Sequence, residues 1–417
     1  MKFFGTWTIG SLLAVTLIAP GAAAQTPDTL RIAAIVAEAR RANPMLQAAR
    51  YQADAMEERG SQAGALPDPT LTLGLRNRPV DFGTENMMTM NWVGVSQRFP
   101  WPGIQRFSRL RQDHFARAAD LDADEMEAAL VARVKDVYFQ LAWMDRALDI
   151  MASTRELLRD FLEVTSAKYA VGKGLQQDIL QAQVAIAQIT ADITIVEQNR
   201  LAMAARLNSL LGRPATEPIG SLELFDPAGP LPAVDSLMEI AAASRPAIRA
   251  ARERALAAEA GYRAAQRDAH PDFTFALGYG QRPQFEDLAT IELGISLPLW
   301  SGSKQVPKIR EMRAFQSAEE ARELDLHNET FARLSELRAS AERARDLSTL
   351  YRTSIIPQAQ AAVESALSAY RVGDVDYMTL LSNQTTVNRF ETERVRLAAE
   401  FQSAVAGIEA LTGVAVQ

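Results

Sequence analysis

The sequence predicts a mostly α-helical chain with a small β part, built as a tandem duplication of long coiled-coil helical hairpins. Three observations support this fold class. The two halves repeat each other at an offset of about 200 residues, residues 104–213 contain no proline, and four short segments alternate apolar residues with small or polar ones. Helices of such length do not fit a compact globular core.

Residues 1–24 have the features of a removed secretory signal. A basic start at Met1-Lys2 precedes an apolar run from Ile9 to Ala19 and the small residues Ala22-Ala23-Ala24. A retained membrane anchor is the alternative, but the run is shorter than the roughly 20 residues that span a bilayer. No later run is comparable, so we expect a membrane contact of the mature chain to be made by a β-barrel.

Composition excludes several classes of function. The chain has no cysteine, which excludes disulfides, thiolate metal sites and cysteine nucleophiles. Its 44 basic and 51 acidic residues are spread along the chain and give a net charge of −7, so we expect no nucleic-acid partner. The histidines are isolated and no Gly-rich phosphate loop is present. We therefore expect no catalytic residues, no cofactor, no metal site and no enzyme activity.

The repeat defines the domain organisation. Asn43-Pro44 corresponds to Arg245-Pro246, and the strongest match aligns Lys168–Gly172 with Ala369–Gly373. Each half is predicted to contain a helix, two strands, a long helix, a tight turn and a second long helix. The first repeat covers 25–213, a linker covers 214–235, and the second repeat covers 236–417.

Two long helices and one turn are predicted in each repeat. A helix over 104–168 would be on the order of 95 Å long, and Gly172 and Gly174 mark the turn after it. Alternating steps of four and three residues trace an apolar seam over 182–210, with Arg200 as its polar member. The same steps over 383–411 meet two exceptions, Asn383 and Arg394. In the second repeat Pro357 predicts a kink or break.

Four segments have the period-two pattern of strands. Phe273, Phe275, Leu277 and Tyr279 alternate with small or polar residues, and a partner follows to give a hairpin over about 272–298. The first repeat has a hairpin over about 70–98, with a less regular second strand. This alternation is typical of barrel strands with one face in lipid and one toward a wet lumen. A soluble hairpin packed on a helix is the alternative.

Four strands cannot close a barrel, because about eight is the smallest number that does and open edges are not tolerated in lipid. Several chains must therefore share one barrel. A dimer would give eight strands and a lumen filled by side chains, whereas a trimer would give twelve and leave an aqueous path. The sequence favours a trimeric 12-stranded β-barrel, continued by the long helices as a periplasmic α-barrel.

This arrangement resembles the TolC family of outer-membrane efflux and secretion proteins over nearly the whole mature chain. The most specific marks are the two inter-helix tips, which carry Tyr169, Gly172, Leu180 and Gln183 in the first repeat and Tyr370, Gly373 and Leu381 in the second. The resemblance implies a homotrimer in the bacterial outer membrane that extends into the periplasm. It also implies contact with outer-membrane lipid and two protein partners, a periplasmic adaptor and an inner-membrane pump.

The resemblance further implies that the tips near 171–175 and 372–376 dock the adaptor. The expected docking residues are Tyr169, Val171, Gly172, Lys173, Gly174, Leu175, Tyr370, Val372, Gly373, Asp374 and Val375. A candidate periplasmic gate lies beside them. The family's gate aspartates correspond here to Thr379 and Ser382, and the nearest acids are Asp374 and Asp376. These acids could form an electronegative ring that attracts cations, or simply complement a helix N-terminus.

The segments 66–69 and 97–103 look like the heavy-metal branch of the family, which partners resistance-nodulation-division pumps. Their prolines also have a structural interpretation, because proline stops a strand ladder and starts a helix. The expected function is a passive exit duct, with heavy-metal cations as the first choice of cargo. Drugs or proteins of a type I secretion system could use the same shell. A pore-free periplasmic coiled-coil scaffold is the alternative from another class.

Overall fold

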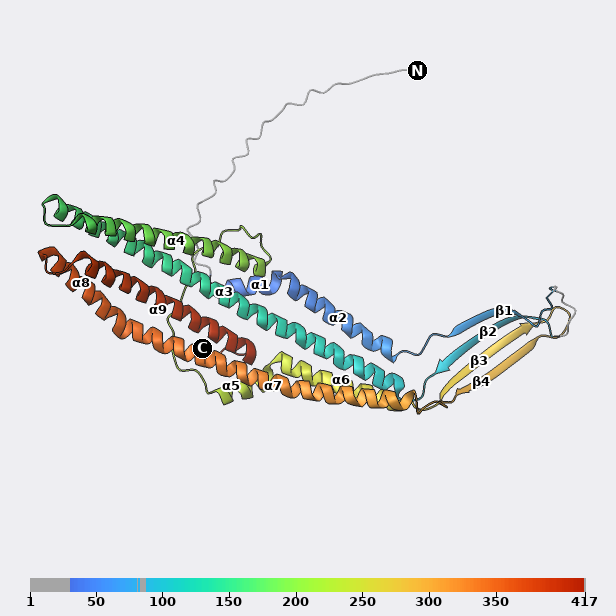
Figure 1. Ribbon diagram of the computed structural model, residues 1–417. Helices are drawn as coiled ribbons and strands as arrows, with labels where there is room; N and C mark the ends of the chain where they lie inside the picture. The colour runs from blue at the N-terminus through green and yellow to red at the C-terminus, as the bar shows by residue number, and fades with distance from the viewer. Residues whose placement is uncertain (1–30, 81, 83–87, 416–417) are drawn as a thin grey trace, which may run out of the picture.

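The computed structural model describes residues 31–80, 82 and 88–415, so the predicted signal at 1–24 lies outside the described residues. The molecule is elongated, with four strands at one end and the tips of two helical hairpins at the other (Figure 1). The mostly helical fold class with a small four-stranded sheet is confirmed.

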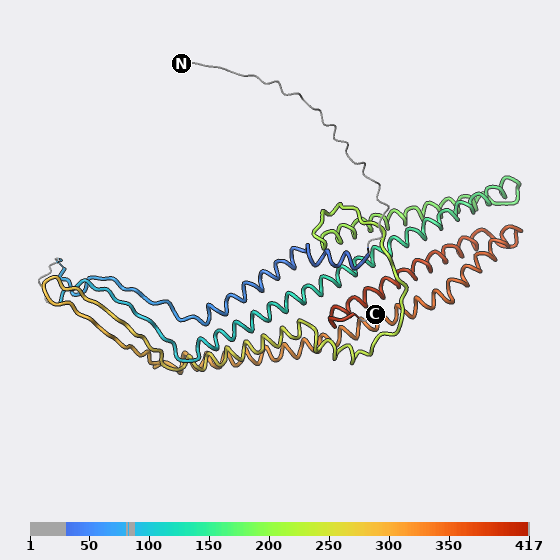
Figure 2. The backbone as a smooth tube through the Cα atoms, turned by 180° about the vertical axis from the view of Figure 1, so that it is seen from behind, coloured from blue at the N-terminus to red at the C-terminus, as the bar shows by residue number. Residues whose placement is uncertain are grey.

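The two repeats contain the same elements in the same order. The first repeat consists of α1 (Ile32–Ala42), α2 (Pro44–Gly64), β1 (Thr70–Arg76), β2 (Met90–Phe99), α3 (Ile104–Ala170) and α4 (Gln176–Leu211). The second consists of α5 (Val234–Ser244), α6 (Pro246–Arg267), β3 (Asp272–Gln281), β4 (Leu288–Ser296), α7 (Gln305–Leu350), a π-helical turn (Tyr351–Ile355), α8 (Ile356–Val372) and α9 (Tyr377–Thr412). The helical hairpins α3–α4 and α8–α9 run side by side to their tips (Figures 1 and 2).

Each repeat begins with two helices where the sequence predicted one. Proline disfavours the helical conformation of the residue before it, and it is well suited to the first position of a helix. Asn43 and Arg245, which precede the prolines, are both extended, and a new helix starts at Pro44 and Pro246. The Asn43 side chain accepts hydrogen bonds from the amides of the first turn of α2 and donates one to the Leu210 carbonyl at 2.9 Å. The break therefore ties the start of α2 to the end of α4.

The break expected near Pro357 is present. The regular α-helix ends at Leu350, and Tyr351–Ile355 form a single π-helical turn before α8 starts at Ile356. Proline lacks the amide hydrogen that an uninterrupted helix needs, so the widened turn absorbs the missing hydrogen bond. The equivalent helix of the first repeat, α3, has no proline and is unbroken over 67 residues.

The four strands form one antiparallel sheet in the order β1-β2-β3-β4. Ser96 lies opposite Thr70 on one side and Ala276 on the other, and Ser296 lies opposite Asp272. In this register the odd-numbered residues of all strands share one face and the even-numbered residues share the other. The odd face carries the predicted apolar residues, among them Leu71, Leu73, Val93, Val95, Phe275, Leu277, Tyr279, Ile291, Leu293 and Ile295, each of which is exposed. The two faces thus have the chemistry of lipid-facing and lumen-facing surfaces.

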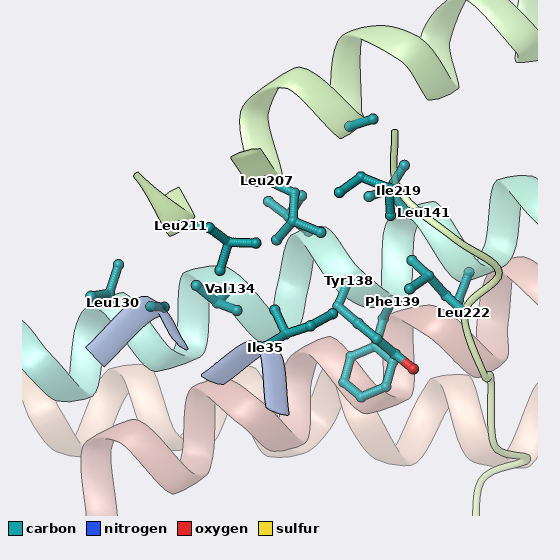
Figure 3. Close-up of a cluster of buried hydrophobic side chains, with 14 of the residues drawn as sticks. Ile35, Leu130, Val134, Tyr138, Phe139, Leu141, Leu207, Leu211, Ile219 and Leu222 are labelled. Carbon is teal, nitrogen blue, oxygen red and sulfur yellow. The ribbon is translucent and has the colours of Figure 1, made fainter. Parts of the chain in front are cut away.

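The largest buried cluster lies where α1 packs on α3 and α4 (Figure 3). Ile35, Val134, Tyr138, Leu207 and Leu211 are each at most 2% exposed. Each of these side chains contributes about 1.5–3 kcal/mol by leaving water. The linker after α4 adds Ile219 and Leu222 to the cluster, and the amide of Glu223 donates to the Tyr138 hydroxyl at 3.0 Å. This contact fixes the middle of the molecule.

Two of the three polar members of the predicted seams, Arg200 and Arg394, hold the linker. Arg200 forms an ion pair with Asp145 on α3 and donates to the carbonyl of Ile219 in the linker at 3.3 Å. Arg394 on α9 forms an ion pair with Asp226 of the same linker at 2.8 Å. These two exceptions to the apolar pattern therefore attach one crossing segment to the two helical hairpins, whereas the third, Asn383, donates to the Ala362 carbonyl on α8 at 3.5 Å.

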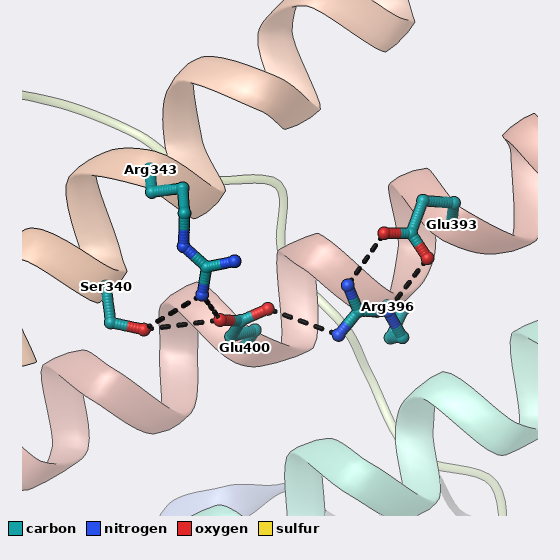
Figure 4. Close-up of polar contacts among 5 residues, drawn as sticks. All are labelled: Ser340, Arg343, Glu393, Arg396 and Glu400. Carbon is teal, nitrogen blue, oxygen red and sulfur yellow. Dashed lines mark hydrogen bonds and ion pairs between the residues drawn. The ribbon is translucent and has the colours of Figure 1, made fainter.

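A charged network joins α7 to α9 (Figure 4). Glu400 accepts from Arg343 across the interface and from Arg396 on its own helix, and Arg396 also contacts Glu393 at 2.7 Å. The hydrogen bond from Arg396 lowers the pKa of Glu393 below its usual range. Glu393 therefore stays ionised near neutral pH, and the network lies at a partly exposed surface.

One helix of the described part of the chain, α4, is long and apolar enough to cross a membrane by length and composition. Only 17% of its most apolar stretch is buried within this single chain. Its exposed apolar residues include Leu180, Val184, Ile195 and Leu201. The other face of α4 packs along α3, so the helix is one wall of a coiled-coil hairpin with an uncovered apolar side.

Candidate functional site

The two hairpin tips form the candidate functional site, and the first tip is a tight glycine turn. Gly172 adopts a left-handed conformation with φ 71°, and its amide donates to the Tyr169 carbonyl at 2.9 Å. A Cβ at Gly174 would lie 2.9 Å from the backbone nitrogen of Tyr169. Glycine is therefore required at both positions, at one by the backbone angle and at the other by the close approach.

The second tip ends α8 and starts α9 with two standard caps. Gly373 is left-handed with φ 93°, and the amides of Gly373 and Asp374 both donate to the Ala369 carbonyl at 3.0 Å. Asp376 then caps α9, because its carboxylate accepts from the Thr379 amide at 2.9 Å. The tip therefore has a defined backbone, and its conformation follows from residues that the sequence singled out.

Lys168 and Tyr370 connect the two hairpins at this end. The Lys168 ammonium lies 4.1 Å from the centroid of the Tyr370 ring and donates to the Tyr370 carbonyl, which is near the C-terminal end of α8. Carbonyls in the last turn of a helix have no partner within the helix, and a cation there also complements the helix dipole. Lys168 thus adds from α3 a second donor to a carbonyl that also accepts from the Gly373 amide at 3.2 Å.

Two buried tyrosines pack behind this contact. The rings of Tyr370 and Tyr377 meet edge to face with centroids 5.9 Å apart. Their hydroxyls are buried and have no hydrogen-bond partner among the described residues. Burial, with a further contribution from the nearby Asp178 carboxylate, raises the pKa of each phenol to about 12. Both phenols are therefore neutral over the physiological range.

The structure places most of the predicted docking residues on the outside of the tips. Val372 is 74% exposed, and Tyr169, Val171, Lys173, Leu175, Gly172, Gly373 and Asp374 are also exposed, whereas Gly174 and Val375 are half-buried. Tyr370 differs from its repeat-equivalent Tyr169, because it is only 4% exposed and lies between the hairpins. In this conformation Tyr370 supports the tip from inside.

The candidate gate residues are exposed around the start of α9. Asp374, Asp376, Thr379 and Ser382 all face solvent. The hydrogen bonds from Thr379 lower the pKa of Asp376 below its usual range. Asp376 therefore carries a negative charge near neutral pH and also caps the helix, which means that the structural role and the proposed electrostatic role are compatible at this residue.

A hollow of about 400 Å³ lies between the hairpins. It is lined by α3, α8 and α9, with Phe161, Val363 and Val387 on its apolar side and Glu364 and Glu391 at its edge. A hydrogen bond of 3.1 Å between Thr154 and Asn388 crosses beside it. The hairpins are thus joined by a buried apolar cluster, to which Phe161 contributes from the first hairpin and Tyr370 and Tyr377 from the second, and by a few polar contacts around the hollow.

Sequence reasoning missed the role of Lys168 and the burial of Tyr370. The available signal was a difference between the repeats, since Lys168 corresponds to Ala369. An exact duplication would have had the same residue at both positions. A charged residue in one copy only therefore indicates that the two equivalent positions have different neighbours. Among the described residues, no group of three acidic or histidine side chains could hold a metal ion.

The paired hairpins and the short two-faced sheet define a protein of the channel-forming efflux class. The family model for outer membrane efflux proteins matches residues 35–213 and 237–414. The chain therefore belongs to the outer membrane efflux protein family, and it is an efflux channel rather than an enzyme. By sequence alone, no curated protein is significantly similar to it.

Solved structures of outer-membrane channels have the same fold. CusC superposes with a TM-score of 0.80 at 14% identity, over 95% of this chain and 95% of that one. VceC from Vibrio cholerae gives 0.78 at 17% identity, over 93% and 97%. OprN gives 0.76 at 20% identity, over 92% and 89%. At these identities the likeness establishes the fold.

Proposed function

We propose that the chain is one protomer of a homotrimeric duct that carries heavy-metal cations passively through the periplasm and the outer membrane. The observation that carries the proposal is the two-faced sheet with two open edges. Its odd face is apolar, its even face is mostly small and polar apart from Met90 and Trp92 on β2, and β1 and β4 each lack a neighbour on one side within the described chain. Open edges must be paired in lipid, so several copies must close the barrel.

The width of the barrel lumen favours three chains over two. Four strands per chain give eight in a dimer, whose lumen would be filled by its own side chains, and twelve in a trimer. The uncovered apolar side of α4, which includes Leu180, Val184 and Ile195, supports the same assembly. In a trimer this side would meet a neighbouring chain and continue the wall as an α-barrel.

The tips are the proposed docking surface for a periplasmic adaptor that couples the duct to an inner-membrane pump. Exposed apolar residues at a helix turn, such as Val171, Leu175 and Val372, have no partner in the described chain. Val171→Glu with Val372→Glu should abolish co-purification with the adaptor. Tyr51→Glu, at an equally exposed residue of α2, is the matched control and should bind normally. Unchanged binding by the tip variant would locate the adaptor elsewhere.

Asp374 and Asp376 are the proposed gate acids. In a trimer they would place two carboxylates from each chain around the periplasmic mouth, where like charges resist close approach and attract cations. Asp376→Asn tests this role, because asparagine caps a helix as well as aspartate does but carries no charge. We expect Asp374→Asn with Asp376→Asn to reduce cation preference at unchanged stability. An unchanged reversal potential in a salt gradient would exclude the gate role.

The cargo assignment rests on the segments 66–69 and 97–103, which are similar to the heavy-metal branch. It is tested in cells. A strain without this chain should become hypersensitive to copper, silver or zinc salts, and a strain with the wild-type chain should recover. Hypersensitivity to drugs alone, or loss of a secreted protein, would change the cargo and leave the duct intact.

A further inference from the structure

The polar face of the sheet, defined by the even-numbered residues of β1–β4, carries four charged residues. These are Arg76 on β1, Arg98 on β2, Asp272 on β3 and Glu292 on β4, so the charges on this face sum to zero. The same face has a hollow of about 180 Å³ whose lining includes Arg76, Glu292 and Trp92. Opposite charges on neighbouring strands of a sheet stabilise the pairing of those strands.

Two of the four charges are paired within the chain. Arg98 forms an ion pair with Asp272 across the β2–β3 seam, and the second oxygen of Asp272 accepts from the Trp101 amide at 3.0 Å. Arg76 and Glu292 form no ion pair among the described residues, and both are exposed. They stand on the two free edges of the sheet, with opposite signs and on the same face.

Arg76 is held in place on the wall. Its guanidinium carbon lies 3.7 Å from the centroid of the Trp92 ring. The indole in turn lies flat on the sheet, because Gly94 and Gly278 have no side chain beneath it and a Cβ at either position would overlap the ring. Trp92, seated over the two glycines, therefore holds the Arg76 side chain at the edge strand.

The internal repeat predicts the register at which two copies join. Ser96 and Ser296 are equivalent, since they pair with the equivalent residues Thr70 and Asp272. Within the chain, Gly94 lies opposite Gly278 across the β2–β3 seam. A shift of 200 residues relates Gly94 of β2 to Gly294 of β4, and a shift of 202 residues relates Gly278 of β3 to Arg76 of β1. When β4 pairs with β1 of a second copy as β2 pairs with β3, Gly294 lies opposite the partner's Arg76. Glu292 then lies one diagonal step away, which is within reach of long side chains.

We infer that Glu292 pairs with Arg76 of the partner subunit across the β4–β1 seam and thereby fixes the register of the barrel. This inference rests on the proposed shared barrel. The seam within each chain is joined by Arg98–Asp272, and the seam between chains is joined by the second pair. The pairing leaves no net charge on the polar face, so the strand wall does not select cargo by charge.

The absence of cysteine allows a direct test. Arg76→Cys with Gly294→Cys puts thiols at directly opposed positions, and Gly294 has room for a side chain because its nearest neighbour, the Thr274 Cβ, is 3.6 Å away. After oxidation we expect linked chains on a denaturing gel without reductant. Chains that carry only one of the two cysteines should link when they are co-expressed and should not link alone. Arg76→Cys with Leu288→Cys, six residues along the strand, is the control and should stay unlinked.

The ion pair is tested by charge reversal. Arg76→Glu and Glu292→Arg should each lower the temperature at which the trimer dissociates, and the double variant should recover most of the loss. Linking at the control pair only, or charge effects that simply add, would overturn this inference while leaving a trimer. A protein that runs as a monomer in mild detergent would instead contradict the proposed duct itself.

Discussion

The ammonium of Lys168 lies 4.1 Å from the ring centroid of Tyr370 and donates to the carbonyl of the same residue. A residue of the first hairpin thereby contacts the last turn of α8 in the second. A buried apolar cluster that includes Phe161, Tyr370 and Tyr377 also joins the hairpins at this end, beside a hollow of about 400 Å³. The contact between Lys168 and Tyr370 thus adds a polar link at the tip end of an apolar interface.

Lys168→Met should loosen the tips. The variant loses a cation–π contact and a charged hydrogen bond, together worth about 1–2 kcal/mol at this half-exposed position. We expect a larger separation between spin labels on the two tips and a higher single-channel conductance. Lys168→Arg retains the cation and is the matched control. An unchanged label distance in Lys168→Met would show that other contacts hold the tips.

Tyr370→Phe and Tyr377→Phe should leave the tips as stable as in the wild type or more stable. Each removes a buried hydroxyl that has no partner among the described residues, so the change relieves a desolvation cost of up to about 1 kcal/mol. Thermal unfolding followed by near-ultraviolet circular dichroism measures the effect. A clear loss of stability in either variant would reveal a hydrogen bond to ordered water.

Alkaline pH should destabilise the tips. The pKa of Tyr370 and of Tyr377 is raised to about 12 in the folded chain, whereas an unfolded tyrosine titrates near about 10. Their contribution to stability is therefore complete below pH about 10 and is lost as the pH rises through about 12. A spectroscopic titration of tyrosinate should show late-titrating phenols in the wild type and one fewer in Tyr370→Phe. Titration of every tyrosine near pH 10 would contradict this burial.

Arg200→Met should destabilise the chain more than Arg394→Met. Arg200 and Asp145 are each about one-fifth exposed, and Arg200 also holds a linker carbonyl, so its loss leaves a carboxylate poorly paired at a cost of about 1–3 kcal/mol. Asp226, the partner of Arg394, is more than half exposed, and a pair of that kind is worth about 0–1 kcal/mol. Denaturant unfolding of the two variants gives the comparison, and equal losses would contradict it.

Much of the fold could be predicted from the sequence, because each helix and strand of one repeat has an equivalent in the other repeat that supports the same prediction. The less regular strand of the first repeat, β2 at Met90–Phe99, is confirmed, and it lies centrally in the sheet with Trp92 over glycines. Its alternation was obscured because its polar-face positions hold large apolar residues where the other strands have small ones. The break at Pro357 also followed from the residue type alone.

The surroundings of equivalent residues could not be predicted in the same way. Tyr169 and Tyr370 occupy equivalent positions, yet one is exposed and the other is buried. Periodicity specifies which side of a helix is apolar, but it does not specify which of two similar hairpins lies against the other. The pairing of Arg200 and Arg394 with the linker was equally inaccessible, since it depends on the path of a segment without periodic structure.

Single-channel recording tests the duct most directly. Purified protein, extracted in detergent and added to a planar lipid bilayer, should insert as a trimer and give stable conductance. Asp374→Asn with Asp376→Asn should insert equally well and show a reduced preference for cations. A wild-type protein that is soluble without detergent and never produces a conductance step would contradict the duct and favour a pore-free periplasmic scaffold.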